Sequence, residues 1–303
     1  MKTLDQWLRL LESRHPVEIE LGLARISAVA RKLNIGTIAT KVVVVAGTNG
    51  KGSCVRTLES LALAAGLQVA TYTSPHLIRY NERVRIQGRD VSDAQLCEAF
   101  ETIDAQRGDT PLTYFEVGTL AAFLVMAAQP LDLAVLEIGL GGRYDAVNII
   151  DGDVAVITSI ALDHQHWLGD NREVIGREKA GIARAGRPVV CADPEPPTSL
   201  VDYLTEIGAK PYYAGRDFRL HYSRLQHNGE RLCLSVLDAE GHTREWPDLP
   251  LPVLPGTIEA YIRSRRARRA SGAAPRGPLV ACAVRCGGWA VLGPLERPVP
   301  TGL

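Results

Sequence analysis

The sequence lacks the cysteine pattern of a disulfide-stapled or metal-binding protein. Its six cysteines form no Cys-x-x-Cys pair and no closely spaced framework. They stand at Cys54, Cys97, Cys191, Cys233, Cys282 and Cys286. Isolated cysteines are typical of reduced thiols in the cytosol, so we nominate none as a ligand and expect a cytoplasmic protein.

It also lacks an apolar run long enough to cross a membrane. The longest uncharged stretch, residues 117–131, is shorter than the roughly 20 residues that a membrane-spanning helix needs. The segment Met1–Leu8 contains an aspartate and an early amphipathic spacing, which are not features of a secretory signal. We therefore expect a soluble protein without a membrane partner.

A net charge of one sign is absent as well. Lys and Arg together number 34, as do Asp and Glu, which argues against attraction of the whole chain to nucleic acid or to an acidic membrane. Residues 256–303 differ, because eight Arg, no Lys and two Glu give them a net charge of +6 and leave −6 for residues 1–255. The basic run Arg263–Arg269 has no interleaved aromatic residues. It favours a short solvated helix running into disorder over a nucleic-acid site.

The sequence does contain a regular alternation of apolar runs and helical patterns. Apolar spacing predicts helices around Leu4–Leu11 and Ile19–Leu33. Runs typical of buried strands follow at Val42–Ala46, Val69–Thr73, Leu133–Glu137, Val154–Thr158 and Pro188–Ala192, and helical patterns lie near residues 54–65, 93–106, 115–128 and 171–184. This alternation predicts an α/β fold: a P-loop-type parallel sheet with helices on both faces and ligands at the carboxyl ends of its strands.

The chain changes character beyond residue 196. A helical pattern near residues 198–207 precedes alternating runs at 217–222 and 231–238, with a Gly-Glu turn between the two runs. The proline-spaced segment Leu249–Pro255 predicts an extended linker. We therefore expect one domain over residues 1–255 and a disordered Arg/Ala/Gly/Pro-rich tail over residues 256–303.

The most informative motif is the glycine-rich loop Gly47–Ser53, which follows the first predicted strand directly. Such a turn places backbone N–H groups and a helix N-terminus around an anion, and Lys51 can reach the β- and γ-phosphates of a nucleotide. Gly52, however, separates Lys51 from the hydroxyl of Ser53. In an ordinary P-loop the hydroxyl next to the lysine binds Mg²⁺, so here the metal ligands are expected elsewhere.

Two predicted strand ends offer such ligands. Glu137 ends one apolar run, and Asp163 and His164 follow another. A helix-capping role for Glu137 is the alternative to metal binding. Taken alone, His164 is more typical of a structural histidine, with Asp163 orienting it.

Six segments in this order carry a family resemblance: Gly47–Ser53, Ser74–Leu77, Thr113–Glu116, Leu136–Asn148, Ser159–His164 and Gly176–Ile182. They resemble the folylpolyglutamate synthase family of the Mur ligase superfamily, especially its bacterial bifunctional dihydrofolate synthase/folylpolyglutamate synthase members. The resemblance covers about residues 1–255 and implies the central ATP-binding domain of a Mur ligase. The inserted glycine of the phosphate loop is this family's own variant.

The resemblance implies a role for particular residues. The ATP phosphates would be bound by Thr48, Asn49, Gly50, Lys51, Gly52 and Ser53. Mg²⁺, at two sites, would be bound by Ser74, Glu137 and His164, with a carbamylated Lys179 assisting the second metal. The pterin site would be lined by Thr113, Tyr114, Phe115, Glu116, Tyr144, Asp145 and Ala146. From periodicity alone, Tyr114 and Phe115 are core aromatics and Lys179 is an exposed lysine.

The same resemblance implies that the loop Ser74–Arg85, with Arg79, Arg83 and Arg85, borders the folate and its glutamate chain. A solvated charged loop is the alternative.

The implied reaction is an ATP-dependent amide ligation. A carboxylate of dihydropteroate, or of a folate's terminal glutamate, would take the γ-phosphoryl group of ATP, and the amine of L-glutamate would then displace phosphate from the acyl phosphate. Lys51, His164 and Lys179 would be the catalytic residues. Phosphoryl transfer depends on positioning and charge neutralisation, which fits a sequence without a Ser-His-Asp arrangement. The implied partners are small molecules, and we expect a monomer.

The resemblance stops at the proline-spaced segment. The family's asparagine-bearing helix is not found, because Ile258 stands where the asparagine is expected, and the Asp-x-Ala-His-Asn-Pro motif of the C-terminal domain is also missing. A reading-frame shift in a GC-rich gene is one hypothesis for the abrupt change after Pro255. We expect impaired turnover; the alternatives are a non-catalytic relic and another Mur-type amide ligase.

Overall fold

An eight-stranded, mostly parallel sheet forms the centre of the molecule. The structure, a computed structural model, describes residues 2–14, 20–225, 229–237 and 243–250. The strands of this sheet are β1 (Lys41–Ala46), β2 (Val69–Tyr72), β3 (Val84–Ile86), β4 (Arg89–Asp90), β5 (Leu133–Glu137), β6 (Val154–Ile157), β7 (Pro188–Cys191) and β8 (Lys210–Tyr213). Their order is β4-β3-β2-β5-β1-β6-β7-β8, and the two antiparallel pairs are β2–β3 and β3–β4. The predicted α/β fold is confirmed.

All five strands predicted from the apolar runs are present, each within a residue or two of its expected bounds. Three strands of this sheet were not predicted. The strands β3 and β4 have three and two residues, too few to show a period. The third, β8, is only partly buried at the sheet edge, so its sequence Lys-Pro-Tyr-Tyr lacks the apolar character of a central strand.

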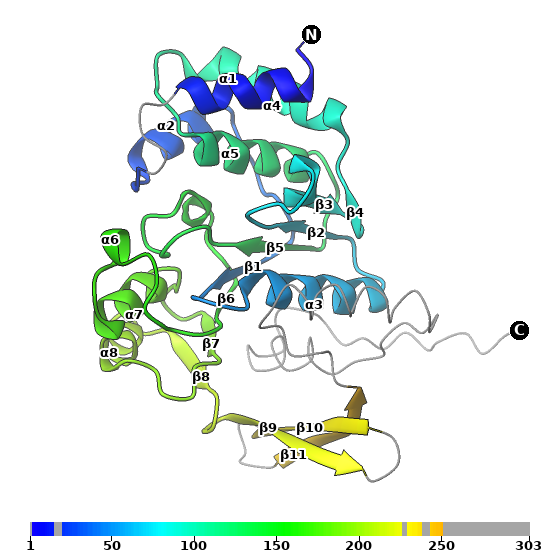
Figure 1. The fold of residues 1–303 in the computed structure, drawn as a ribbon, viewed down its shortest axis with the longest axis vertical. Helices are drawn as coiled ribbons and strands as arrows, with labels where there is room; N and C mark the ends of the chain where they lie inside the picture. Colours follow the sequence, from blue (N-terminus) through cyan, green and yellow to red (C-terminus); the bar gives the residue numbers. More distant parts are fainter. Residues whose placement is uncertain (1, 15–19, 226–228, 238–242, 251–303) are drawn as a thin grey trace, which may run out of the picture.

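Helices connect the strands and cover both faces of the sheet (Figure 1). They are α1 (Leu4–Arg14), α2 (Ala24–Lys32), α3 (Lys51–Ala64), α4 (Asp93–Arg107), α5 (Tyr114–Ala127), α6 (Gln165–Leu168), α7 (Arg172–Ala180) and α8 (Thr198–Glu206), with short 3₁₀ helices η1 (Tyr80–Arg83) and η2 (Ala146–Ile149). The second helix was predicted over Ile19–Leu33, but α2 begins only at Ala24. Residues 15–19 are outside the described part.

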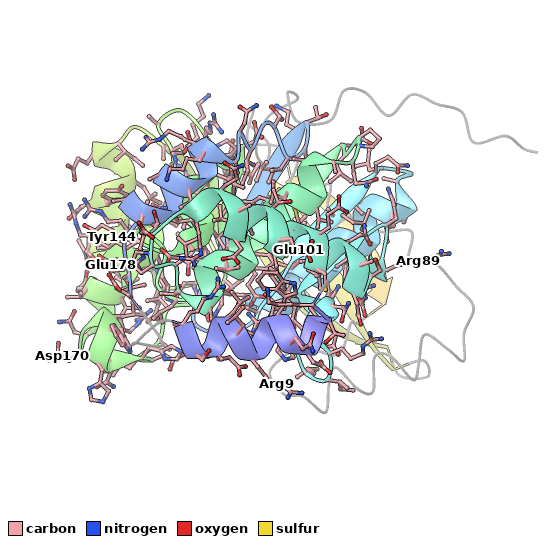
Figure 2. All side chains as sticks on the ribbon, turned by 90° about the horizontal axis from the view of Figure 1, so that it is seen from above. Arg9, Arg89, Glu101, Tyr144, Asp170 and Glu178 are labelled. Atoms are coloured by element: carbon pink, nitrogen blue, oxygen red, sulfur yellow. The ribbon has the colours of Figure 1, made fainter. Side chains whose placement is uncertain are left out.

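The alternation of side chains along β1 divides the core into two clusters. Val43 and Val45 pack with Val55 and Leu58 of α3 on one face. Val44 and its same-face neighbours join the larger cluster on the other face, which includes side chains of α1, α2, α4 and α5. Exposed charged side chains such as Arg9, Arg89 and Asp170 point outward at the rim (Figure 2). The sheet is therefore buried on both faces, as a parallel sheet requires.

A separate three-stranded antiparallel sheet follows the central sheet. It consists of β9 (Phe218–Leu225), β10 (Gly229–Leu237) and β11 (Thr243–Pro250), in the order β11-β10-β9. The two predicted alternating runs correspond to β9 and β10, but Gly229 and Glu230 belong to β10 rather than to a turn. The first two residues of the predicted linker end β11. The rest of that linker and the tail at residues 256–303 lie outside the described residues.

Candidate active site

The strand order places the glycine-rich loop and the predicted metal ligands along one edge of the sheet. β2, β5, β1 and β6 are consecutive neighbours, and they run parallel, so their carboxyl ends meet at the same edge. Val45 of β1 pairs with Glu137 of β5, and Ala46 pairs with Ile157 of β6. Ser74, Glu137, the glycine-rich loop and the segment that leads to His164 therefore leave the sheet side by side.

The glycine-rich loop is held against the segment after β6. The hydroxyl of Thr48 donates to the carbonyl of Ala161 at 3.1 Å and accepts from its N–H at 3.0 Å. Gly47 has a φ of +147°, and a Cβ at this position would lie 1.9 Å from Oγ1 of Thr158. Gly50 also has a positive φ, +85°, as the residue before α3. The loop thus needs glycine at both positions for its backbone to take this shape.

The inserted Gly52 lies directly against a buried carboxylate. A Cβ on Gly52 would be 3.4 Å from Oε2 of Glu137. Lys51, next to it, folds back over its own loop, where its ammonium donates to the carbonyls of Gly47 at 2.9 Å and Thr48 at 3.2 Å. The carboxylate at the end of β5 therefore lies close to the start of α3, at a distance where a Cβ on residue 52 would make an ordinary van der Waals contact.

Glu137 is buried without a full set of partners. Glu137 is only 4% exposed. Its Oε2 accepts a hydrogen bond from the backbone N–H of Ser74 at 3.2 Å. Burial raises the pKa of this carboxyl to about 7, although nearby Lys51 and the Ser74 hydrogen bond act in the opposite direction. The alternative, that Glu137 caps the next helix, is wrong. Its Oε2 accepts instead from the N–H of Ser74 in the loop after β2, and Asp145 caps η2. A carboxylate in this position is suited to a divalent cation.

His164 and Lys179 face the same small cavity as the loop. This cavity is lined by Gly47, Lys51, Ile138, Gly139, Leu140, Gly141, Asp163, His164, Leu168 and Lys179. Lys179 is 3% exposed, so the alternative of an exposed lysine is wrong. Burial and the charge of Lys51 lower its pKa to about 8. The His164 side chain is 56% exposed, and its Nε2 lies 3.7 Å from Oδ2 of Asp163.

No group of three His, Cys, Asp or Glu side chains gathers as a metal site in the described part of the chain. The predicted metal set of Ser74, Glu137 and His164 contains one carboxylate, one hydroxyl and one imidazole. Of these, Glu137 accepts a hydrogen bond from the backbone N–H of Ser74. His164 lines both cavities and Ser74 lines only the larger one.

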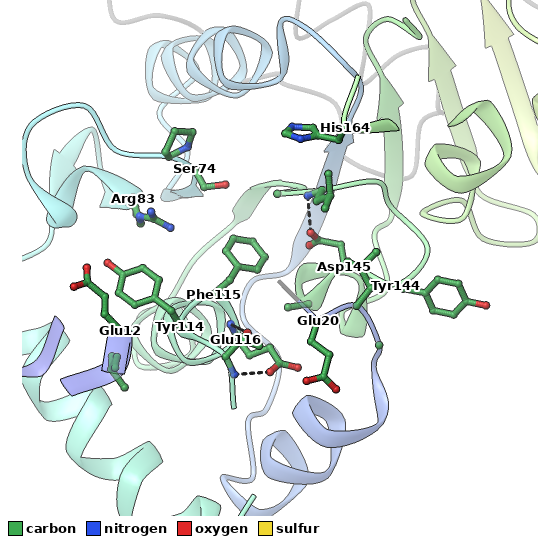
Figure 3. Close-up of a pocket in the computed structure, with 18 of the residues that line it drawn as sticks. Glu12, Glu20, Ser74, Arg83, Tyr114, Phe115, Glu116, Tyr144, Asp145 and His164 are labelled. Carbon is green, nitrogen blue, oxygen red and sulfur yellow. Dashed lines mark hydrogen bonds between the residues drawn. The ribbon is translucent and has the colours of Figure 1, made fainter. Parts of the chain in front are cut away.

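A second, larger pocket of about 730 Å³ opens next to this edge (Figure 3). Every residue of the predicted pterin site lines it, namely Thr113, Tyr114, Phe115, Glu116, Tyr144, Asp145 and Ala146. Ser74 and His164 line it too, so the pocket begins where the predicted metal ligands stand. The two pockets are adjacent compartments of one site.

Comparison with known proteins agrees with this geometry. No family model matches the chain. The dihydrofolate synthase/folylpolyglutamate synthase of Escherichia coli K12 is 48% identical over 269 residues, which are 89% of this chain and 61% of the relative. The structure of E. coli FolC with DHPP and ADP matches with a TM-score of 0.78 at 44% identity, over 96% of this chain and 66% of the other.

A Yersinia pestis structure extends the match. This bifunctional folylpolyglutamate synthase/dihydrofolate synthase, complexed with AMPPNP and Mn, gives a TM-score of 0.77 at 44% identity, over 99% of this chain and 69% of the other. The chain belongs to the dihydrofolate synthase/folylpolyglutamate synthase family. It spans about 61% of the length of the E. coli relative.

In this member of the folylpolyglutamate synthase family, Thr113 and Glu116 have a structural role besides lining the pocket. Thr113 is the N-cap of α5, where its hydroxyl accepts from the N–H of Glu116 at 3.2 Å and its own N–H donates to Glu116 Oε2 at 2.8 Å. Arg25 also donates to Oε2, at 2.9 Å. The pattern Thr-x-x-Glu is the sequence signal of such a capping box.

The two carboxylate oxygens of Glu116 differ in their hydrogen bonding. Oε2 accepts two hydrogen bonds, whereas Oε1 is buried and has no hydrogen-bond partner among the described residues. Asp145, on the opposite wall, is 2% exposed and accepts from the N–H groups of Leu140 and Val147 at 2.8 and 2.9 Å. Burial raises the pKa of Asp145 to about 6 despite these hydrogen bonds. Both side chains can accept hydrogen bonds from a ligand in the pocket.

Sequence reasoning missed the N-terminal wall of the pocket. It consists of Leu11, Glu12, Glu20, Leu21 and Gly22, and His76 and Arg83 also line the pocket. Gly22, with a φ of +148°, donates its N–H to the carbonyl of Tyr144 at 3.2 Å, which connects this segment to the predicted site. The isolated glycine after Leu21 was the only local signal of a turn there.

Proposed function

We propose that this chain is an ATP-dependent glutamate ligase that acts on dihydropteroate and on folates, the activity for which its relatives are named. The observation that carries the proposal is the junction of two compartments at one sheet edge. One holds a phosphate-type loop with Lys51 beside buried Glu137, and the other is the 730 Å³ pocket. Such a junction brings a carboxylate to the γ-phosphate of a nucleotide.

Residues 48–53 would bind the ATP phosphates. The N-terminus of α3 and the glycine-rich backbone supply N–H groups, and Lys51 can exchange its two carbonyl contacts for phosphate oxygens. The complexes of the relatives with ADP and with AMPPNP support this assignment.

A divalent cation fits the residues beside this loop. Burial raises the pKa of the Glu137 carboxyl, and a bound Mg²⁺ would favour the ionised form of this group. Ser74, Glu137 and His164 would hold the ion, which would neutralise phosphate charge during transfer. The Mn ion in the Y. pestis relative supports a divalent site.

The pocket would hold the pterin. Oε1 of Glu116 and the buried Asp145 are acceptors for the amino and ring N–H groups of a pterin, and Phe115 and Tyr114 give the pocket an aromatic wall. The carboxylate end of dihydropteroate would then extend toward Ser74. E. coli FolC in complex with DHPP supports a ligand of this kind.

The reaction would have two steps. A carboxylate oxygen attacks the γ-phosphorus of ATP, which gives an acyl phosphate and ADP. The amine of L-glutamate then attacks the acyl carbon, which releases inorganic phosphate and a proton. Lys51 would balance the charge that moves with the phosphoryl group. His164, which lines both pockets, would position the metal ion and the reacting carboxylate where the two pockets meet.

Lys179 would carry a carbamate in the active form. Its lowered pKa, about 8, leaves a substantial part of the amine neutral near that pH, and the neutral amine is the form that adds CO₂. The resulting anion would face Lys51 across the small cavity and assist a second Mg²⁺. We also propose a monomer that acts in the cytoplasm on small molecules.

The proposal is tested by ADP release in the presence of Mg²⁺, dihydropteroate and L-glutamate. ADP formation that requires all three, and that is lost in Lys51→Met, is the expected result. A panel that includes cell-wall precursors identifies another Mur-type ligase if one of them replaces dihydropteroate. Isothermal titration with AMPPNP separates nucleotide binding from turnover, and absence of nucleotide binding would refute the proposal.

A further inference from the structure

One cation in the large pocket, Arg83, has no acidic partner in the part of the chain that the structure describes. Arg83, on η1, is 8% exposed and lines the pocket. Among the described residues no Asp or Glu forms an ion pair with its guanidinium, although Arg79 and Arg85 of the same loop both have such pairs. Buried charges in proteins are normally paired, so an unpaired one that faces a pocket indicates an anionic ligand.

The groups that hold Arg83 are neutral. Its Nε donates to Nδ1 of His76 at 2.9 Å. The guanidinium carbon lies 5.1 Å from the ring centroid of Tyr80 and 5.7 Å from that of Tyr114, and the Tyr72 hydroxyl is also a partner. These contacts fix the plane of the guanidinium without neutralising its charge.

Arg83 lies at the end of the pocket that is next to Ser74, so it would contact only one end of a bound ligand. The N–H of Thr73 donates to the carbonyl of Arg83 at 2.8 Å, so η1 lies beside the strand end that carries Ser74. Figure 3 shows Arg83 and Ser74 along one side of the pocket and Glu20 and Glu116 on another, with Glu12 beside Tyr114 between them. An N–H-rich heterocycle suits the acidic side, and an anion suits the side nearest the phosphate loop.

We propose that Arg83 binds the carboxylate that is to be activated, and that His76 is a positioning residue that holds the Arg83 guanidinium toward the pocket. This inference rests on the proposed function and names the group that orients its substrate. The Nε–H of Arg83 is committed to His76, so its terminal nitrogens are the donors available to a carboxylate. A guanidinium matches a carboxylate in a forked geometry that lysine cannot reproduce.

The experiment compares two ligands that differ only in the carboxylate. Dihydropteroate and 6-(anilinomethyl)-7,8-dihydropterin, its analogue without the carboxylate, are titrated calorimetrically into the whole chain. The wild type is expected to bind the acid about tenfold or more tightly than the analogue, the usual size of a hydrogen bond to a charged group. Arg83→Met should remove this preference and leave the affinity for the analogue unchanged, which also shows that the variant is folded.

Two variants separate positioning by His76 from mere packing. His76→Leu should lose most of the preference for the acid, whereas His76→Asn, whose Oδ1 can accept where Nδ1 did, should retain most of it. Arg83→Lys should fall between wild type and Arg83→Met. The exposed Arg89→Met is the control and should bind both ligands as the wild type does.

The outcomes that overturn the inference are distinct from failure of the proposed function. Equal affinity of the wild type for the two ligands, or equal loss of both in Arg83→Met, would show that Arg83 does not bind the carboxylate. Equal effects of His76→Leu and His76→Asn would overturn the positioning role. If the wild type bound neither ligand, the proposed function itself would be wrong, and the inference with it.

Discussion

Glu137→Gln tests whether the buried carboxylate at the junction is kept for a cation. In the metal-free protein, burial raises the pKa of Glu137 from 4.5 to about 7. The unfolded chain therefore ionises this group first as the pH rises, and the free energy of unfolding falls between about pH 4.5 and pH 7. One pKa unit corresponds to about 1.4 kcal/mol, so this loss amounts to roughly 3 kcal/mol.

The substitution removes this pH-dependent cost. In EDTA at pH 8, Glu137→Gln is expected to unfold with a free energy up to roughly 3 kcal/mol above that of the wild type, and at pH 4.5 the difference should be small. Urea denaturation across this pH range measures it. Glu98→Gln, an exposed carboxylate on α4, is the control and should change stability by less than about 0.5 kcal/mol.

Addition of Mg²⁺ and AMPPNP should reverse the order. The ligands are expected to stabilise the wild type at pH 8 and to stabilise Glu137→Gln much less, because the amide has no charge for the ion. A variant less stable than the wild type at pH 8 in EDTA would contradict the reasoning. So would equal stabilisation of both proteins by Mg²⁺ and AMPPNP.

Three further predictions concern other parts of the site. Gly47→Ala should weaken AMPPNP binding and stability more than Gly186→Ala, because a Cβ on Gly47 meets Thr158 whereas Gly186, also at positive φ, has open space; equal effects in calorimetry and urea denaturation would contradict this. With ¹³C-bicarbonate at pH 8, the wild type should give a carbamate carbon NMR signal that weakens below the lowered pKa of Lys179, and a signal that persists in Lys179→Arg would refute the assignment. Arg25→Met should cost about 3 kcal/mol in urea denaturation by leaving buried Glu116 unpaired; a change within about 0.5 kcal/mol would show that the pair is not structural.

Sequence patterns predicted five of the eight strands of the central sheet, since these five are buried, mostly apolar runs. They also predicted which strand ends line the candidate site, because the carboxyl ends of parallel strands share one edge. From the Gly52 insertion we predicted metal ligands outside the loop, and Glu137, one of the residues named for that role, lies next to Gly52. The prediction that Thr113–Glu116 lines the substrate pocket came from family resemblance alone.

Other parts of the site depend on long-range packing. Glu12 and Glu20 reach the pocket because α1, which contains Glu12, and α2, which follows Glu20 in the chain, pack against α5, and no local pattern shows this. The burial of Lys179 also follows from tertiary structure, since α7 packs against Gly142. Among the three arginines of the loop, only the fold distinguishes Arg83 from the paired Arg79 and Arg85.

The most direct test of the central claim is a crystal structure of the chain with Mg²⁺, AMPPNP and dihydropteroate. The account predicts the phosphates on residues 48–53, the metal ion on Glu137 and Ser74, and the pterin in the 730 Å³ pocket with its carboxylate directed toward the γ-phosphate. A dihydropteroate bound outside this pocket, or a metal ion that does not contact Glu137, would contradict it.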